Sequence, residues 1–325
     1  MLLREGRYFI VGGAGFLGSH FTDALLADAG TRRVTLFDNF SSGREWHYET
    51  HQSDVRLSIV RADASDVEAL TATMTGHDWV IHLAANPDIA RAEQSPEIDF
   101  YRGTLLTNNV VEAMRRSGVQ RILYASGSGV YGDAGDTVLQ EDYAPLVPIS
   151  PYGASKLASE ALIASYCAMF GLRALVLRFG NIVGARQTHG VGFDFLRSLR
   201  VKPKRLRILG NGEQKKPYIH ASDVVRAAFC AAQNASAPFS VFNVATDDTL
   251  TVTEIAELAA EALGLAAAPA FDYSGGPRGW RGDVPVVRLD SSRAHSLGWF
   301  PKWNSRDAMR QSLQELVADE RILRS

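Results

Sequence analysis

Residues 8–18 read YFIVGGAGFLG, an apolar run of strand length that leads into a glycine-rich turn and then a helical pattern. Gly12 permits the tight turn, Gly15 lets the backbone approach a pyrophosphate, and Gly18 lets the helix pack closely on the strand. The N-terminus of that helix would offer free N–H groups and a partial positive charge to the phosphates. The stretch predicts a dinucleotide site, and a purely structural glycine turn is the weaker alternative.

Two acidic residues follow the next strand-like runs and extend this interpretation. Asp38 comes directly after the run 34–37 and lies 20 residues beyond Gly18. An acid at this spacing hydrogen-bonds the adenosine ribose and disfavours a 2′-phosphate, so we expect NAD and not NADP. Asp63 follows the run 57–60 and could accept from the adenine amino group; an ordinary exposed turn residue is the alternative.

The first half of the chain alternates strand-like and helix-like segments. Helical periodicity lies between apolar runs of strand length. The expected strands are 8–11, 34–37, 57–60, 79–83, 121–125 and 174–177, and the expected helices are 16–29, 66–74, 105–117 and 153–170. This rhythm predicts a doubly wound α/β fold, in which a parallel sheet of the Rossmann type has helices on both faces. We therefore expect a dinucleotide-binding domain over residues 1–179.

The rhythm changes in the second half. Glycine, proline and basic residues crowd 180–217, and a Gly/Pro-rich loop spans 274–285. Helices are expected near 221–232, 253–263 and 305–318, with a strand at 240–244. We expect residues 180–325 to form a smaller mixed α/β substrate domain, and this boundary leaves room for the chain to cross back to the sheet.

Composition excludes several classes of protein. The 325 residues carry a formal net charge of −2, so no general attraction to nucleic acid or to an anionic membrane is expected. Two cysteines, Cys167 and Cys230, make no disulfide framework and no metal-binding pattern, so we expect reduced thiols and no metal. No apolar run is long enough to cross a membrane, and the N-terminus lacks the apolar stretch of a signal peptide. A soluble cytoplasmic protein is expected.

Three further segments occur in a characteristic order after the glycine turn. They are His82-Leu-Ala-Ala85, Ser126-Gly-Ser-Gly-Val-Tyr-Gly132 and Tyr152-Gly-Ala-Ser-Lys156. With the glycine turn, they resemble the extended short-chain dehydrogenase/reductases that act on nucleotide sugars: epimerases, 4,6-dehydratases and decarboxylases. The resemblance covers nearly the whole chain and includes Arg178-Phe-Gly-Asn181 and Gly210-Asn-Gly-Glu-Gln214. It implies an NAD-dependent enzyme with a nucleotide diphosphate sugar as substrate.

The tyrosine and lysine also have a physical reading of their own. Ser150 and Pro151 suit the N-cap and first residue of a helix, which would place Tyr152 and Lys156 on one helical face. A phenol with an ordinary pKa near ~10 is a poor base at neutral pH. A nearby ammonium group, together with a positive nicotinamide ring, is expected to lower that pKa. The pair would then suit proton abstraction from a sugar hydroxyl. By the resemblance, Lys156 also holds the nicotinamide ribose.

One departure from the resemblance concerns the reacting oxygen of the sugar. Relatives carry a Ser or Thr where this chain has Gly127. Ser128 is the first candidate to supply the missing hydroxyl and Ser126 the second; both could instead only satisfy a buried turn. Dehydratase relatives carry an Asp-Glu pair where Ser128 and Gly129 stand here. Because elimination of water needs these acids and C4 epimerisation does not, we expect a 4-epimerase.

Other reactions of the same family remain alternatives: decarboxylation, 4,6-dehydration and 4-keto reduction. A catalytically silent NAD-binding protein is the rival from another class, suggested by Gly127 and disfavoured by the intact tyrosine and lysine. The resemblance also implies a homodimer through helices 105–117 and 153–170. The further residues that it implies for the cofactor are Phe16, Leu17, Asn39, Ala64, Leu83, Ala84 and Ala85. Those that it implies for the substrate, besides Ser128 and Tyr152, are Asn86, Asn181, Lys216, Arg281 and Asp283.

Overall fold

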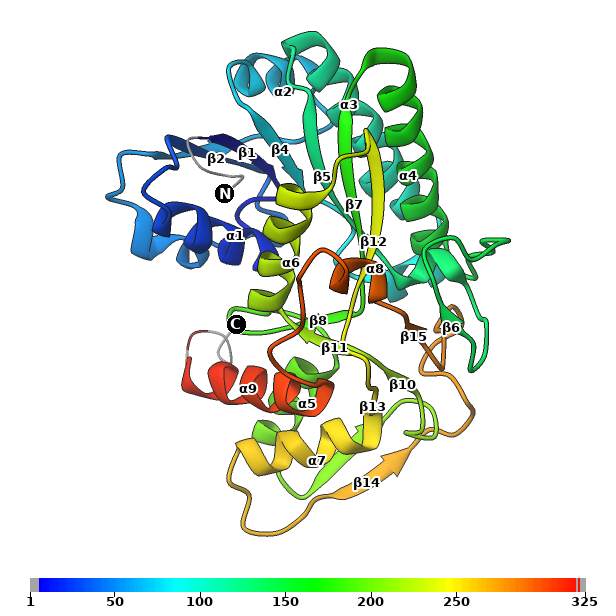
Figure 1. The fold of residues 1–325 in the computed structure, drawn as a ribbon. Coiled ribbons are helices and arrows are strands. Elements are labelled where there is room, and N and C mark those ends of the chain that lie inside the picture. The colour runs from blue at the N-terminus through cyan, green and yellow to red at the C-terminus, as the bar shows by residue number, and fades with distance from the viewer. Residues whose placement is uncertain (1–5, 320, 322–325) are drawn as a thin grey trace.

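A seven-stranded sheet forms the centre of the molecule in the computed structural model, which describes residues 6–319 and 321 (Figure 1). The order across the sheet is β12 (Phe239–Val244), β7 (Arg173–Phe179), β5 (Arg121–Gly127), β4 (Trp79–His82), β1 (Arg7–Val11), β2 (Arg33–Asp38) and β3 (Leu57–Arg61). All neighbouring strands in this sheet pair in parallel. The chain runs outward from β1 to β3 and then returns to the other side of β1 with β4. Ligands of such sheets bind at the carboxyl ends of the strands where the order reverses, here between β1 and β4.

Helices cover both faces of this sheet. The first face packs on α1 (Phe16–Ala27) and α6 (Ala221–Asn234). The second face packs on α2 (Val67–Met74), α3 (Leu105–Ser117) and α4 (Pro151–Phe170). Because both faces are covered, the strands are apolar almost throughout. The predicted doubly wound α/β fold is confirmed.

The start of α4 is fixed by its own sequence. The Ser150 hydroxyl accepts a hydrogen bond from Gly153 N at 3.1 Å, and Pro151 is the first helical residue. The other end is closed by Gly171 in the left-handed conformation, with φ of 72°. The expected cap is confirmed, and it fixes where the first turn of α4 presents its side chains.

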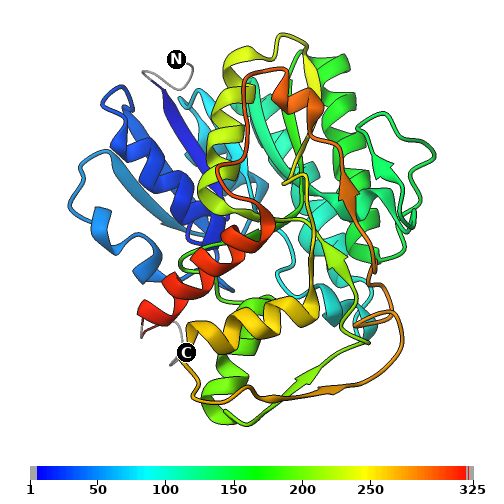
Figure 2. The same ribbon diagram turned by 60° about the horizontal axis from the view of Figure 1, so that its bottom comes forward.

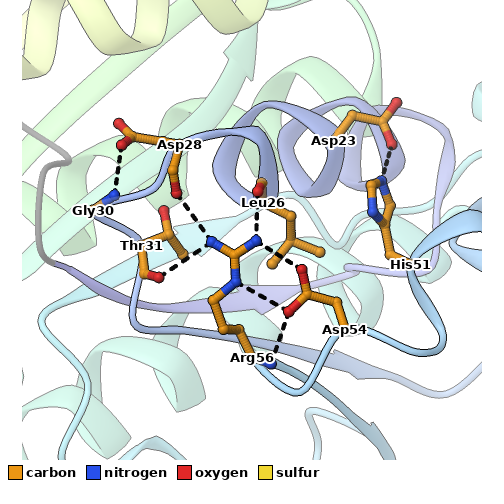
Figure 3. Close-up of polar contacts among 8 residues, drawn as sticks. All are labelled: Asp23, Leu26, Asp28, Gly30, Thr31, His51, Asp54 and Arg56. Carbon is orange, nitrogen blue, oxygen red and sulfur yellow. Dashed lines mark hydrogen bonds and ion pairs between the residues drawn. The ribbon is translucent and has the colours of Figure 1, made fainter.

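An arginine closes the C-terminal end of α1 (Figure 3). Helix ends leave backbone carbonyls without partners, and the Arg56 guanidinium donates to Leu26 O at 2.6 Å and to Asp28 O at 3.1 Å. Asp54 holds the same guanidinium in an ion pair at 2.7 Å. Beside it, His51 contacts Asp23 of α1 at 2.8 Å. These contacts tie the segment before β3 to the helix that follows the glycine turn.

A second unit lies beyond the carboxyl ends of the sheet (Figure 2). Its core lies among α5 (Val191–Val201), α7 (Val252–Ala262) and α9 (Ser305–Ala318). Short strand pairs border this core: β8 (Asn181–Val183) with β11 (Tyr218–His220), β9 (Arg205–Ile208) with β14 (Ala270–Tyr273), and β10 (Lys215–Lys216) with β13 (Leu250–Thr251). A further pair, β6 (Val138–Leu139) with β15 (Arg288–Leu289), packs in a separate apolar cluster with Val130 and Tyr131. The short helix α8 (Ser292–His295) packs beside β12.

The chain crosses between the two units more than once. After β7 it enters the second unit, and it returns to the large sheet with α6 and β12. Residues 221–244 therefore belong spatially to the sheet although they follow residue 180. Within residues 6–319 and 321, no helix combines the length and apolarity needed to cross a membrane.

Candidate active site

The glycine turn packs closely on neighbouring backbone and leaves the N-terminus of α1 uncapped. A Cβ on Gly12, whose φ is +80°, would lie 2.8 Å from Ala84 N, and one on Gly18 would collide with Gly13 O. Gly15 is the N-cap of α1 and no side chain caps this helix, so its first N–H groups are free to bind an anion. Phe16 and Leu17 form the first helical turn. These features fit the pyrophosphate of a dinucleotide.

Asp38 lies at the end of β2, directly against this turn. Its carboxylate accepts from Ala14 N at 2.9 Å and from Phe40 N at 2.7 Å. Burial raises the pKa of Asp38, while both N–H groups and Arg61 act in the opposite direction. Since a carboxylate can accept about four hydrogen bonds, lone pairs remain for a ribose hydroxyl.

Asp63 is held at the next position along the sheet edge. Asn39 donates to its Oδ2 atom at 2.7 Å, and Arg102 pairs with the same oxygen at 3.0 Å. Burial alone would raise the pKa of Asp63, but these bonds and those from Ser65 lower it well below its usual range. Asn39 thus orients Asp63. Arg102 was missed by sequence reasoning, because 39 residues separate it from its partner.

The remaining cofactor candidates lie along the same edge. Leu83 N and Ala84 N both donate to Val11 O, which fixes the chain after β4 against β1. Leu83, Ala84 and Ala85 are half-buried, and Ala64 is buried. The sheet edge therefore brings together the residues that the sequence assigned to the cofactor.

Tyr152 and Lys156 lie one turn apart on α4, beside the carboxyl end of β5. The Lys156 ammonium donates to Ala125 O at 2.6 Å and lies 5.5 Å from the centre of the Tyr152 ring. Burial lowers the pKa of Lys156 to about 8, while Glu160 and Asp99 act in the opposite direction. The lysine is therefore a cation at neutral pH.

The expected lowering of the tyrosine pKa is not found in the protein alone. Burial, and then the carboxylate of Asp99, raise the pKa of Tyr152 to about 12. Sequence reasoning counted the favourable lysine and omitted both opposing effects, because neither burial nor Asp99 could be placed beside Tyr152 from the sequence. Tyr152, in the first turn of α4, is therefore a protonated phenol at neutral pH in the protein alone.

The two serine candidates have different surroundings. Ser126 is buried, and its hydroxyl donates to Glu160 at 2.5 Å. Ser128 begins a short 3₁₀ turn over residues 128–131, and its half-buried hydroxyl bonds to none of the residues that the structure describes. A Cβ added at Gly127 would meet nothing within 4 Å. The geometry thus leaves Ser128 and the space at Gly127 available to a ligand.

A buried ion pair supports this corner of the site. Glu160 and Arg178 are paired at 2.7 Å, and each side chain is only 5% exposed. Glu160 also receives the Ser126 hydroxyl, so β5, α4 and β7 are joined at one point. Arg178 lies over the Tyr131 ring at 4.8 Å. In the sequence Arg178 stands only as part of a motif, and its partner Glu160 is 18 residues away.

Asn86 was expected to bind substrate, but its amide is already engaged. It donates to Asp99 Oδ1 at 2.9 Å and to Asp88 O at 2.8 Å, and its oxygen accepts from Asp88 N. Asn86 is also buried. In this structure the side chain therefore holds Asp99, which sequence reasoning did not single out.

The second unit contributes the other substrate candidates. The Lys216 ammonium pairs with Asp283 at 2.5 Å, and this carboxylate also accepts from Gly279 N. Asn181 lies on β8 opposite Tyr218 of β11. Arg281 is exposed, and its backbone N–H donates to Glu93 at 2.9 Å. Lys216 is therefore already neutralised, which sequence reasoning did not foresee.

Comparison with known proteins gives a family match. The model of the NAD dependent epimerase/dehydratase family matches residues 8–245. The UDP-glucose 4-epimerase of Mycolicibacterium smegmatis is 32% identical over 304 residues, which cover 91% of this chain and 94% of that protein. A dTDP-glucose 4,6-dehydratase from an Actinoplanes species is 28% identical over 316 residues, 90% of this chain and 97% of that protein.

Solved structures agree with this assignment. A crystal structure of a UDP-galactose 4-epimerase matches with a TM-score of 0.85 and 34% identity, covering 96% of this chain and 99% of that chain. The UDP-glucose 4-epimerase of Thermus thermophilus, solved in complex with NAD, matches with a TM-score of 0.84 and 29% identity over the same shares. Since the family match spans most of the chain and the glycine turn fits a dinucleotide, this protein is an enzyme of the NAD dependent epimerase/dehydratase family, with NAD as its cofactor.

Proposed function

We propose that this enzyme is a nucleotide-sugar 4-epimerase that works through a transient 4-keto sugar. The observation that carries the proposal is the segment Ser126–Gly132, which brings hydroxyl groups to the site and contains no carboxylate. Elimination reactions need a general acid and base besides the tyrosine, whereas inversion at C4 needs one group that takes and returns a proton. The names of its relatives support the same choice, since several are 4-epimerases of UDP-sugars.

In this mechanism Tyr152 moves the proton. Its phenolate takes the proton of the 4-hydroxyl as C4 is oxidised, and returns it after the keto sugar has presented its other face. NAD, held by the glycine turn and Asp38, would supply a hydride acceptor and donor for C4, and the positive charge of its nicotinamide ring would favour the phenolate. The Lys156 ammonium, one turn along α4, stabilises the same anion.

Ser128 is proposed to orient the reacting oxygen. Its hydroxyl has no partner among residues 6–319 and 321, whereas that of Ser126 is bound to Glu160. To reach the sugar, the Ser126 hydroxyl would have to give up its hydrogen bond to the buried Glu160 carboxylate, and a bond to a charged group is costly to lose. We therefore assign Ser128 to the substrate and Ser126 to the support of α4.

The nucleotide diphosphate is proposed to lie against the second unit. Lys216 and Arg281 would face the phosphates there, with Asn181 and Asp283 beside them. Asp283 offsets the charge of Lys216, so Arg281, whose side chain pairs with no described residue, would supply much of the attraction. UDP-glucose and UDP-galactose are the first substrates to test, because relatives are named for them.

A 4,6-dehydratase is the second candidate, because one 28% identical relative carries that name. Ser128 and Gly129 stand where dehydratase relatives carry acids, and this is the observation against it. A decarboxylase or a 4-keto reductase lacks an observation of its own in this chain. A silent NAD-binding protein would have no need of both Tyr152 and Lys156. We also propose that the enzyme is a cytoplasmic homodimer.

The test is product analysis by NMR. Purified protein is incubated with UDP-, GDP-, CDP- and dTDP-sugars, and Tyr152→Phe protein serves as the matched control. We expect the 4-epimer of at least one sugar with wild-type protein alone. A 4-keto-6-deoxy sugar would instead establish the dehydratase. Loss of a carboxyl group would establish the decarboxylase, and NAD-loaded protein without any turnover would establish the silent protein.

A further inference from the structure

A buried carboxylate lies behind the tyrosine–lysine pair. Asp99 is only 1% exposed and precedes the π-helical turn over residues 100–104, which leads into α3. The Ser155 hydroxyl donates to Asp99 O at 2.7 Å, which docks the Asp99 backbone against α4 beside Lys156. Asn86 holds the Asp99 Oδ1 atom at 2.9 Å. Two polar contacts therefore fix this carboxylate next to the first turns of α4.

The other carboxylate oxygen is buried and has no hydrogen-bond donor. Asp99 Oδ2 bonds to no atom of residues 6–319 and 321. A buried carboxylate that lacks a donor is expensive to keep charged, and burial raises the pKa of Asp99 while Asn86 and Lys156 oppose that rise. The Asp99 carboxylate acts through space on Tyr152 and Lys156, and it raises the pKa of each.

The other titratable groups around this pair are accounted for. Glu160, one turn along α4, is paired with Arg178 and receives the Ser126 hydroxyl. His82 of β4 is fully buried, and burial and then Lys156 lower its pKa to about 3, so it is neutral. Tyr124 of β5 lies with its ring 5.0 Å from the Lys156 ammonium, and burial raises its pKa so that it is neutral too. Asp99 is the carboxylate of this group whose Oδ2 atom has no hydrogen-bond donor among the described residues, and Lys156 is the cation that acts on its charge.

We propose that Asp99 is a positioning residue of the active site. Its buried carboxylate makes Tyr152 and Lys156 keep their protons to higher pH, and it does not touch the substrate. The inference deepens the proposed epimerase and uses the same two side chains. Its consequence is specific: removing the charge makes both groups easier to deprotonate. In the variant, the Tyr152 phenol and the Lys156 ammonium then lose their protons at lower pH.

The first test measures Lys156 directly and needs no turnover. The chain has six lysines, so ¹³C-lysine NMR with Lys156→Met as the assignment standard can follow one resonance. In wild-type protein we expect a pKa of about 8. In Asp99→Asn, which keeps an acceptor for Asn86, we expect a decrease of about one pH unit, the scale of a lost neighbouring charge. Glu97→Gln, an exposed carboxylate in the same segment, should leave it unchanged.

A second variant keeps the test decisive if Asp99→Asn does not fold. Asn86→Ala removes the donor that stabilises the charged Asp99, so the Lys156 pKa should fall in the same direction. The pH–rate profile of an active variant should move to lower pH on both limbs. An unchanged Lys156 pKa in a folded variant would overturn the inference, even if the rate fell. Because the NMR titration needs no substrate, the Lys156 pKa can still be measured if the protein proves to lack epimerase activity.

Discussion

The two serine hydroxyls beside Gly127 differ in the contacts that they make. The resemblance already ranks Ser128 before Ser126, and the contacts favour the same order, because Ser126 donates to Glu160, which lies 34 residues further along the chain. A partner that distant becomes visible only when α4 packs on β5. The tyrosine, the lysine and the glycine turn were predictable because their spacing is local. The Lys216–Asp283 pair, 67 residues apart, was not.

Ser128→Ala should slow epimerisation by ~10-fold or more. A hydrogen bond to a charged group contributes about 1.5–3 kcal/mol, and Ser128 is assigned to the oxygen where charge develops. Ser126→Ala should slow the reaction less but lower the melting temperature more, because buried Glu160 loses one of its donors and keeps only Arg178. Initial rates and thermal unfolding of both variants would check this. The opposite ranking in the rates would move the substrate role to Ser126.

Gly127→Thr should fold normally and should not gain activity. The φ of Gly127 is −168°, an extended conformation that any residue adopts, and its Cβ would meet nothing within 4 Å. The new side chain would fill space that we assign to the sugar. Thermal unfolding and initial rates test the two parts separately. A large rise in rate would show that Ser128 does not replace the missing hydroxyl.

NAD should bind more tightly than NADP. Asp38 accepts from the glycine turn and is placed to accept from a ribose 2′-hydroxyl, whereas it would repel a 2′-phosphate. Calorimetric titration of cofactor-free protein with each dinucleotide would measure the preference. Asp38→Ala should reduce it, and tighter binding of NADP by the wild type would refute the assignment of Asp38.

At the scale of elements, the Glu160–Arg178 pair joins the helix that carries Tyr152 to two strands. Hydrophobic periodicity predicted these elements well, and the bounds of α3 and α9 agree with the expectation. It missed α5, although Phe193, Leu196 and Leu199 recur at helical spacing and are buried there. The glycines, prolines and basic residues of 180–217 obscured that pattern.

Arg178→Met should destabilise the protein by about 3–5 kcal/mol. Removing one member of a buried pair leaves an uncompensated buried charge, here Glu160. The double variant Arg178→Met/Glu160→Leu should recover much of the loss, because both charges are then gone. Urea unfolding of the wild type and the variants measures both effects. Equal losses in the single and double variants would show that packing, and not charge, maintains this contact.

At the scale of the whole molecule, the sequence predicted two units, while the structure shows the chain returning to the sheet with α6 and β12. Periodicity locates segments but does not say which sheet a late strand joins.

The outer face of α4 is the surface on which we expect a second copy of the chain to pack. Ala154, Ala161 and Ala168 are exposed at intervals of seven residues, so they share one face on which a second helix could pack closely.

We expect a homodimer through α3 and α4. Light scattering should give twice the 35.4 kDa of one chain. Ala161→Arg should dissociate the dimer, because a long charged side chain replaces a small one at the proposed contact. Ala267→Arg, at an exposed alanine of the second unit beyond α7, serves as the control. A wild-type monomer at micromolar concentration would contradict the proposal.

In the proposed 4-epimerisation, hydrogen leaves C4 of the sugar and returns to C4. The most direct measurement uses a substrate deuterated at C4 in ordinary water, with the products followed by NMR and mass spectrometry. The account predicts a 4-epimer that keeps its deuterium at C4, and no product with Tyr152→Phe, since general acid–base catalysis contributes ~10²–10⁴-fold. Deuterium lost to water or found at C6, or an active Tyr152→Phe variant, would contradict it.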